Sequence, residues 1–155
     1  MTAALSTATA DPLSGTALEA WRCYLQSPGV IVRELNAELL AEHGITSRDY
    51  DALLYLAQAE SRKLTMSTLA DRTMLTRSGI TRLIDGLVSQ GLVERATCAT
   101  DARISIARLT DTGHARLVAA GALHVAGIQR LFHAKFSESE LDTLASLLGR
   151  LTSAA

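Results

Sequence analysis

The middle of the chain constrains its fold more than any other part. Two threonines, Thr65 and Thr76, are each followed by apolar residues at helical spacing, and threonine is a favoured N-cap residue. The pattern predicts one short helix from Thr65 through Thr73 and a second from Thr76 to about Gln90. Gly91 then supplies a helix end, because glycine readily adopts the left-handed conformation.

Two short strands are expected directly after the second helix. They span Leu92–Ala96 and Ile104–Leu109, with a polar turn between them that leads into Arg103. Lys63 and Leu64 are expected to add a single strand rung before the first helix. Two capped helices, the second polar and basic on one side, followed by a hairpin, outline a winged helix-turn-helix, which places one helix in the major groove of DNA.

Helical patterns also flank this unit. The first begins at about Gly15 and ends at Gly44, and it is expected to kink or restart at Pro28, because proline lacks an N–H group and clashes with the preceding turn. Ser27 would then cap the restarted helix. Thr46 can cap a further helix that runs to about Glu60.

After the hairpin, the spacing of apolar residues predicts a long helix from Asp111 to about Lys135. Ser137 and Glu140 have the spacing of a capping box, which opens a last helix. The fold class expected is therefore mainly α with a small β-hairpin wing, the winged helix-turn-helix lying between helices at both ends.

The composition limits what else the chain can be. Its 155 residues fit one domain, and 48% hydrophobic against 20% charged residues leaves more apolar surface than a small core can hide, which suggests a subunit interface. No apolar run approaches the roughly 18 residues that span a bilayer, and the N-terminus lacks the pattern of a signal peptide. We therefore expect a cytoplasmic protein.

A net charge of −1 looks unsuited to DNA binding, but the charges are unevenly placed. Residues 61–108 carry eight basic and four acidic side chains, a net +4, while the rest of the chain carries a net −5. The predicted winged helix-turn-helix is thus basic, and the rest of the chain is acidic.

Catalytic and metal sites are not indicated. The chain has no nucleophile elbow, no phosphate-binding glycine loop and no paired acidic motif, so it is not expected to be an enzyme or to hold a cofactor. The four histidines lack metal-ligand spacing, and Cys23 and Cys98 have no CxxC-type spacing, so neither a metal site nor a disulfide framework is expected. The histidines are His43, His114, His124 and His133.

Taken together, these motifs resemble those of the MarR (multiple antibiotic resistance regulator) family. The resemblance covers about 130 residues and rests on a set of short motifs at fixed spacing. They are Leu69-Ala70, the segment Arg77-Ser78-Gly79-Ile80-Thr81-Arg82-Leu83, Gly91-Leu92-Val93-Glu94-Arg95, Asp101-x-Arg103 and Leu109-Thr110-x-x-Gly113.

The resemblance implies an obligate homodimer that binds double-stranded DNA at a pseudo-palindromic operator. It also implies that the protein is a repressor and that a small effector, for which aromatic molecules are candidates, releases it from the operator. The chain then divides into an N-terminal tail and one domain. The domain consists of the winged helix-turn-helix, called the reader below, and the dimerisation helices that flank it. The tail is 1–14, the domain 15–155, the reader about 46–110, and the dimerisation helices about 15–43 and 111–152.

Within the reader, the DNA contacts are expected from the second helix and from the wing. The helix residues are Arg77, Ser78, Gly79, Thr81 and Arg82. Arg103 is expected to enter the minor groove, where a narrow A·T tract concentrates negative potential. In similar regulators the aspartate at the position of Asp101 braces the hairpin by pairing with an arginine, and Arg95 is a candidate partner.

The chain departs from the family pattern at two places in the wing. Many members carry a second arginine beside each of Arg95 and Arg103, where this chain has Ala96 and Ile104. Fewer phosphate contacts predict weaker or less salt-dependent binding than is usual.

The resemblance also implies an effector pocket between the flanking helices and the reader. Its candidate residues are Trp21, Arg22, Tyr24, Tyr50 and His124, for which ordinary core packing is the competing interpretation. Two alternative functions remain open. One is an oxidant sensor acting through Cys23, and the other a winged-helix protein-interaction module that does not bind DNA.

Overall fold

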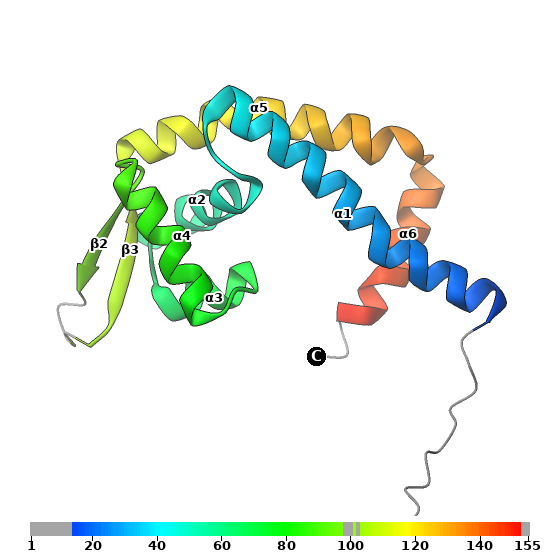
Figure 1. Cartoon of the computed structure of the whole chain (residues 1–155), viewed down its shortest axis with the longest axis horizontal. Helices are drawn as coiled ribbons and strands as arrows, with labels where there is room; N and C mark the ends of the chain where they lie inside the picture. The colour runs from blue at the N-terminus through cyan, green and yellow to red at the C-terminus, as the bar shows by residue number, and fades with distance from the viewer. Residues whose placement is uncertain (1–13, 98–100, 102, 153–155) are drawn as a thin grey trace, which may run out of the picture.

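The molecule is an arch with the reader at one end and the last helix at the other (Figure 1). The computed structural model describes residues 14–97, 101 and 103–152. Its elements are α1 (Gly15–His43), α2 (Ser47–Gln58), η1 (Glu60–Arg62), β1 (Lys63–Thr65), α3 (Met66–Thr73), α4 (Arg77–Ser89), β2 (Val93–Thr97), β3 (Ser105–Leu109), α5 (Asp111–Leu131), η2 (His133–Lys135) and α6 (Glu138–Thr152). The expected fold class, mainly α with a small β-hairpin wing, is confirmed.

Threonine caps set the starts of four helices. The hydroxyl oxygens of Thr46, Thr65, Thr76 and Thr110 each accept a hydrogen bond from the backbone N–H three residues later. Such a cap stabilises a helix by about 1 kcal/mol. The first three caps confirm the sequence prediction, and Thr46 forms a full capping box with Asp49.

The helix restart predicted at Pro28 as one of two outcomes, the other being a kink, is wrong. α1 is continuous from Gly15 to His43, so the chain does not restart, and Ser27 is not an N-cap. Its hydroxyl donates instead to the carbonyl oxygen of Cys23, 2.7 Å away within the helix. The carbonyl that loses its donor to Pro28 belongs to an exposed stretch, where water can replace the missing N–H.

The helix predicted to reach Lys135 ends at Leu131, where a short 3₁₀ turn follows. Only part of the predicted capping box forms beyond it. In that part, the carboxylate of Glu140 accepts hydrogen bonds from both the N–H and the hydroxyl of Ser137. These hydrogen bonds lower the pKa of Glu140.

The three strands form an antiparallel sheet in the order β1-β3-β2. The wing hairpin pairs Val93 with Leu109 and Thr97 with Ser105, and the short β1 adds its rung on the other side of β3. Both strands and the additional rung confirm the sequence prediction. Residues 98–100 and 102 of the turn, and the predicted tail up to residue 13, lie outside the described residues.

The buried core lies inside the reader. Its fully buried side chains come from α1, the turn after it, α2, α3, α4 and the segment before β2. They are Leu39, Ile45, Leu53, Leu56, Leu69, Ile80, Ile84, Leu87 and Leu92. This core fixes α4 against the rest of the reader and leaves its other side exposed.

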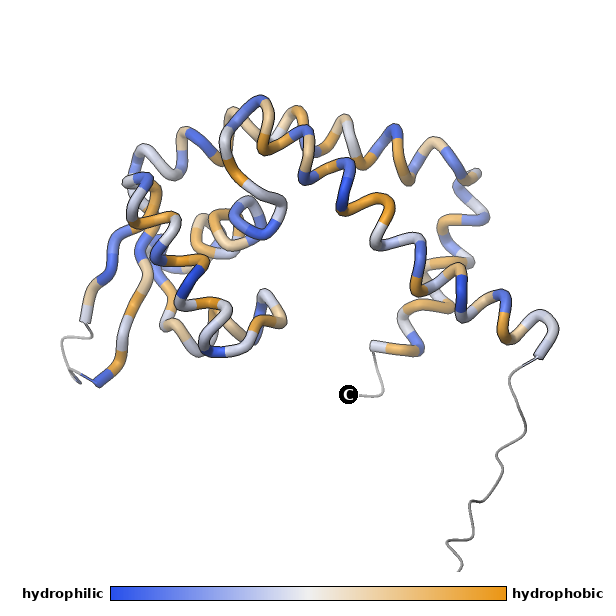
Figure 2. Tube along the Cα trace, in the orientation of Figure 1, coloured by the Kyte–Doolittle hydropathy of each residue, from blue (hydrophilic) through white to orange (hydrophobic). Residues whose placement is uncertain are grey.

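The outer helices, in contrast, expose much of their apolar surface. Apolar positions recur along α1 and α6 in Figure 2, yet α6 has no buried residue and α1 buries only Leu35 and Leu39. The large exposed apolar side chains on α1, α5 and α6 are Trp21, Tyr24, Leu25, Val30, Val32, Leu40, Val118, Val125, Ile128, Leu147, Leu148 and Leu151. No helix among the described residues is long and apolar enough to cross a membrane.

Candidate nucleic-acid interface

α4 presents its polar side to solvent because its apolar side is fully buried. Ile80, Ile84 and Leu87 are at most 1% exposed, whereas the predicted contact residues lie on the opposite side. Arg77, Ser78, Thr81 and Arg82 are exposed and line a shallow hollow together with Thr76. A helix that enters a DNA groove needs this division between a buried face, which holds it in the protein, and an exposed face, called the free face below, which can contact DNA.

The free face is positively charged. Among the described residues, no carboxylate lies within ion-pairing distance of Arg77 or Arg82. Both guanidinium groups are therefore available to phosphates or base edges. The hydroxyl of Thr81 donates to the carbonyl of Arg77 at 2.8 Å, so toward DNA its oxygen is left mainly as an acceptor.

Gly79 serves the helix cap. A Cβ atom at this position would lie 3.2 Å from the hydroxyl oxygen of Thr76, which accepts the Gly79 N–H at 3.1 Å. The small residue therefore leaves room for the cap that begins α4.

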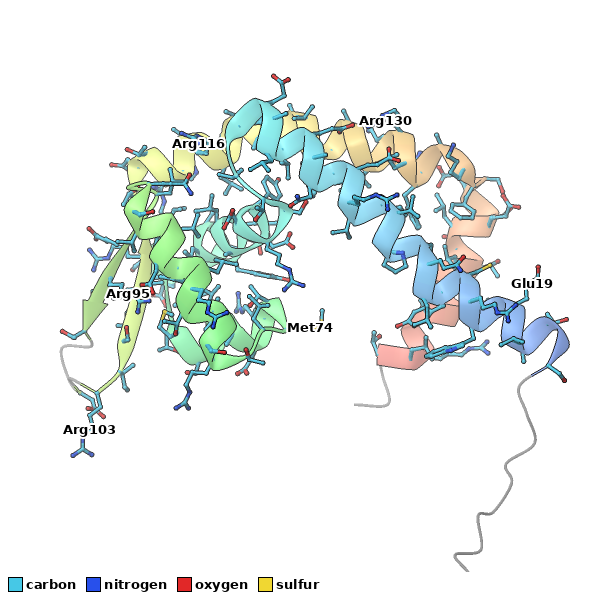
Figure 3. The ribbon with its side chains drawn as sticks, in the orientation of Figure 1. Glu19, Met74, Arg95, Arg103, Arg116 and Arg130 are labelled. Carbon is cyan, nitrogen blue, oxygen red and sulfur yellow. The ribbon has the colours of Figure 1, made fainter. Side chains whose placement is uncertain are left out.

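Arg103 lies at the far end of the wing, whose strands are next to α4 (Figure 3). The side chain is exposed, and its backbone N–H donates to Oδ1 of Asp101 at 2.9 Å. Asp101 thus stabilises the local turn next to Arg103.

Arg95 does not pair with Asp101, contrary to the hypothesis drawn from the sequence. Its Nη2 atom lies 2.8 Å from Oδ1 of Asp85 and 3.4 Å from the carbonyl oxygen of Thr81, both on α4. The prediction missed Asp85, although its i+4 spacing from Thr81 places the two residues on the same side of α4. On the neighbouring position of β2, Glu94 pairs across the sheet with Arg108 at 3.6 Å.

The candidate effector residues separate into two groups. Trp21 and Tyr24 stack on each other with ring centroids 5.8 Å apart, on the exposed outer half of α1, where Arg22 is also exposed. Tyr50 and His124 instead face each other inside the contact between α2 and α5, with centroids 4.4 Å apart. Eighteen residues of helix separate Trp21 from the core residue Leu39, which is about 27 Å at 1.5 Å per residue.

The pair between α2 and α5 is electrostatically unusual. Nδ1 of His124 is buried without a hydrogen-bond partner among the described residues, and burial lowers the pKa of His124 while the nearby Asp51 opposes that shift. Burial also raises the pKa of Asp51, and His124 and Arg48 oppose it. Asp51 directly follows Tyr50 and was not among the residues predicted from the sequence to bind an effector.

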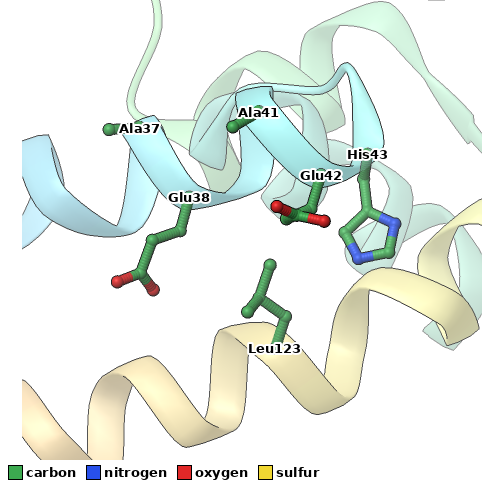
Figure 4. A pocket seen from close by; sticks show the side chains of 6 residues that line it. All are labelled: Ala37, Glu38, Ala41, Glu42, His43 and Leu123. Carbon is green, nitrogen blue, oxygen red and sulfur yellow. The ribbon is translucent and has the colours of Figure 1, made fainter.

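A shallow hollow lies between α1 and α5, outside the predicted effector residues (Figure 4). It is lined by Ala37, Glu38, Ala41, Glu42, His43 and Leu123. Glu38 pairs with Arg130, but Glu42 has no ion-pair partner among the described residues, and its carboxylate would repel an aromatic acid, so this hollow does not have the charge expected for such an effector.

Cys23 is exposed on α1, and Cys98 lies outside the described residues. Within the part of the chain that the structure describes, no cluster of histidine, cysteine and acidic residues could hold a metal ion.

Comparison with known proteins gives matches to regulators of transcription. Residues 43–104 match the model of the MarR family. The transcriptional repressor YetL of Bacillus subtilis is 32% identical over 111 residues, which cover 72% of this chain and 66% of YetL. The chain thus spans slightly less than two thirds of that relative.

Two solved structures extend the comparison to most of the chain. AbsC, a MarR family transcriptional regulator from Streptomyces coelicolor, superposes with a TM-score of 0.87 at 28% identity and covers 94% of this chain and 97% of its own. A cysteine-to-serine mutant of MarR from E. coli, complexed with operator DNA, gives 0.77 at 26% identity, covering 89% and 99%. These proteins regulate transcription and are not enzymes.

Proposed function

Since the chain belongs to the MarR family of transcriptional regulators, we propose that it is a homodimeric repressor that binds a specific DNA operator and leaves it when a small effector binds. Repression is proposed because YetL is a named transcriptional repressor. DNA binding is proposed for this chain because a solved structure of similar fold is complexed with operator DNA. Such a protein acts in the cytoplasm, where the chromosome lies.

One observation supports the proposal most directly: the arginines of α4, which have no ion-pair partner within the described ranges, and the arginine of the wing are exposed at the same end of the molecule. Arg77 and Arg82 would contact base edges and phosphates in the major groove, and Arg103 would enter the adjacent minor groove. Ser78 and Thr81 add hydroxyl groups to the same surface. A protein-interaction module has no need of this arrangement of positive charge.

The exposed apolar side chains of α1, α5 and α6 support the homodimer. A second copy would cover them, and the twofold axis would set two readers side by side. The operator would then contain two half-sites about 10 base pairs apart, centre to centre.

Effector release is supported less directly, by the contact between α2 and α5. This contact joins the reader to a proposed dimerisation helix and contains Tyr50 and His124. A ligand that changes this packing would change the angle between the two readers and move them out of register with successive grooves.

The test is binding to duplexes that the wild-type protein enriches from a random-sequence pool. We expect Arg77→Ala, Arg82→Ala and Arg103→Ala each to weaken binding, by roughly 1–3 kcal/mol where a bidentate base contact is lost. Lys135→Ala removes an exposed positive charge outside the reader and should have no effect. Unchanged affinity in all three reader variants would remove the DNA-binding assignment.

A further inference from the structure

Asp85 is an acidic residue on the helix that we propose to enter the major groove, where its charge would repel phosphates. We infer that Asp85 and Arg95 form a positioning pair, which fixes the wing against the recognition helix so that both contact DNA as one unit. The inference rests on the proposed function and assigns a role to two residues that need not touch DNA.

The alternation of side chains along β2 places Arg95 on the side of the sheet that faces α4. Arg95 stands directly opposite Ala107 on β3, and Val93, two residues earlier, stands opposite Leu109. Ala107, Val93 and Leu109 are all buried, and residues opposite each other on paired strands share a face of the sheet. Arg95 therefore leaves the sheet on its core-facing side.

On α4 the partners of Arg95 lie on the DNA-facing side of the helix. Arg77, Thr81 and Asp85 are spaced four residues apart and thus form one row along α4. The guanidinium of Arg95 reaches the last two members of this row, at 2.8 Å to Asp85 and 3.4 Å to the carbonyl of Thr81. Arg77, at the other end of the row, has no ion-pair partner in the part of the chain that the structure describes.

This bridge links the two DNA-contacting elements directly. β2 leads from Arg95 to the turn that carries Arg103, eight residues later, and the hairpin extends past α4 (Figure 3). Without a lateral bond to α4, the wing could tilt relative to the helix, and the spacing between Arg103 and the α4 arginines would vary. A fixed spacing favours one docking geometry and therefore specific over nonspecific binding.

The alternative is that Arg95 contacts a phosphate itself and that Asp85 merely competes for it. The two interpretations predict opposite effects of removing the acidic charge. If Arg95 contacts DNA, Asp85→Asn frees it and binding tightens. If the pair positions the wing, Asp85→Asn weakens binding as much as loss of the arginine does.

The experiment uses the full chain as wild type, Asp85→Asn, Arg95→Gln and the double variant. Glu94→Gln is the matched control, because it breaks the neighbouring ion pair with Arg108 on the same strand. Affinity is measured for a duplex enriched by the wild type from a random pool and for a scrambled duplex of the same composition, over a range of salt concentrations. Unfolding midpoints are measured alongside.

We expect each single variant to bind the enriched duplex roughly threefold to thirtyfold more weakly, and the double variant no more weakly than either single one, because residues in contact are coupled. Binding to the scrambled duplex, the salt slope and the Glu94→Gln affinity should stay close to those of the wild type. The side chains of Arg95 and Asp85 are 34% and 61% exposed, so unfolding midpoints should change little.

Several results would overturn the inference. They are tighter binding by Asp85→Asn, additive losses in the double variant, a smaller salt slope in Arg95→Gln, or an unfolding midpoint so low that unfolded protein accounts for the lost binding. If the wild type enriches no duplex from the pool, the proposed function itself fails, which is a distinct outcome.

Discussion

The imidazole of His124 lies against the phenol ring of Tyr50, with ring centroids 4.4 Å apart, where α5 packs on α2. Nδ1 of this histidine is buried without a partner among the described residues, so its charged form has lost hydration without gaining a hydrogen bond at that nitrogen. The contact between the reader and the long helix therefore contains a group that tolerates protonation poorly.

We expect this group to make the protein less stable in mild acid. Burial lowers the pKa of His124 in the folded state, so below the unfolded pKa of about 6.5 the unfolded chain binds more protons. Its contribution to the free energy of unfolding is present above that pH and is lost as the pH falls toward the folded pKa. The pKa of Asp51 is raised and acts in the opposite direction, so a comparison between variants is needed.

The measurement is urea unfolding of wild type and His124→Gln between pH 8 and pH 5 at one protein concentration, since a dimer's stability depends on concentration. Asp51 is present in both proteins, and because His124 lowers the pKa of Asp51, its loss in the variant raises that pKa further and changes the difference in the same direction. The wild type should lose more stability than the variant as the pH falls, and parallel pH profiles would contradict the assignment.

A methyl group at Gly113 should destabilise the fold. A Cβ atom there would lie 2.0 Å from the carbonyl oxygen of Leu92 and 2.7 Å from Cδ1 of Leu109, so the start of α5 would have to move away from the sheet. We expect Gly113→Ala to cost about 1–3 kcal/mol in the free energy of unfolding.

Gly86 offers the matched control in α4. Among the described residues, no heavy atom outside the neighbouring backbone of α4 lies within 4 Å of a Cβ at that position, so Gly86→Ala should stabilise the protein by up to about 1 kcal/mol through helix propensity. Chemical denaturation of both variants measures the difference, and an equal effect of the two substitutions would show that close packing at Gly113 is unimportant.

The salt dependence of DNA binding should show whether the α4 arginines contact phosphates. If Arg82 contacts a phosphate in each subunit of a dimer, Arg82→Ala removes two contacts and lowers the slope of log K against log salt by about 1.8. Titrations of the enriched duplex at several salt concentrations measure this slope. Lys135→Ala should leave it unchanged, and an unaltered slope in Arg82→Ala would show that the side chain does not contact a phosphate.

A charge on the apolar side of α6 should weaken the dimer. Leu147 is 48% exposed on a helix that has no fully buried residue, so Leu147→Glu would place a carboxylate in the proposed interface twice, once from each subunit. We expect the dissociation constant, measured by sedimentation equilibrium, to rise at least tenfold, by about 1.4 kcal/mol or more.

Met74 supplies the control for this experiment. It is 92% exposed but lies in the turn between α3 and α4, outside the proposed dimer helices. Met74→Glu should therefore dissociate no more readily than the wild type. A wild-type protein that sediments as a monomer would contradict the homodimer.

The helices of the reader were predictable because their start signals are local. Thr65 and Thr76 accept from N–H groups only three residues away, so the residues that define each start lie within one turn. Pro28 misled the prediction for the opposite reason. Whether a helix continues through a proline depends on what surrounds the carbonyl that loses its donor, and the sequence does not show that this stretch is exposed.

The order of the elements, the threonine caps of α2, α3 and α4, the basic face of α4 and the place of Arg103 after the turn were predictable from the sequence, because each depends on residues within a few positions of one another. The pairing of Arg95 with Asp85 and the packing of His124 on Tyr50, far from Trp21, in contrast became visible with the folded chain. These partners are ten or more residues apart, and packing of the elements around the buried core determines which side chains meet.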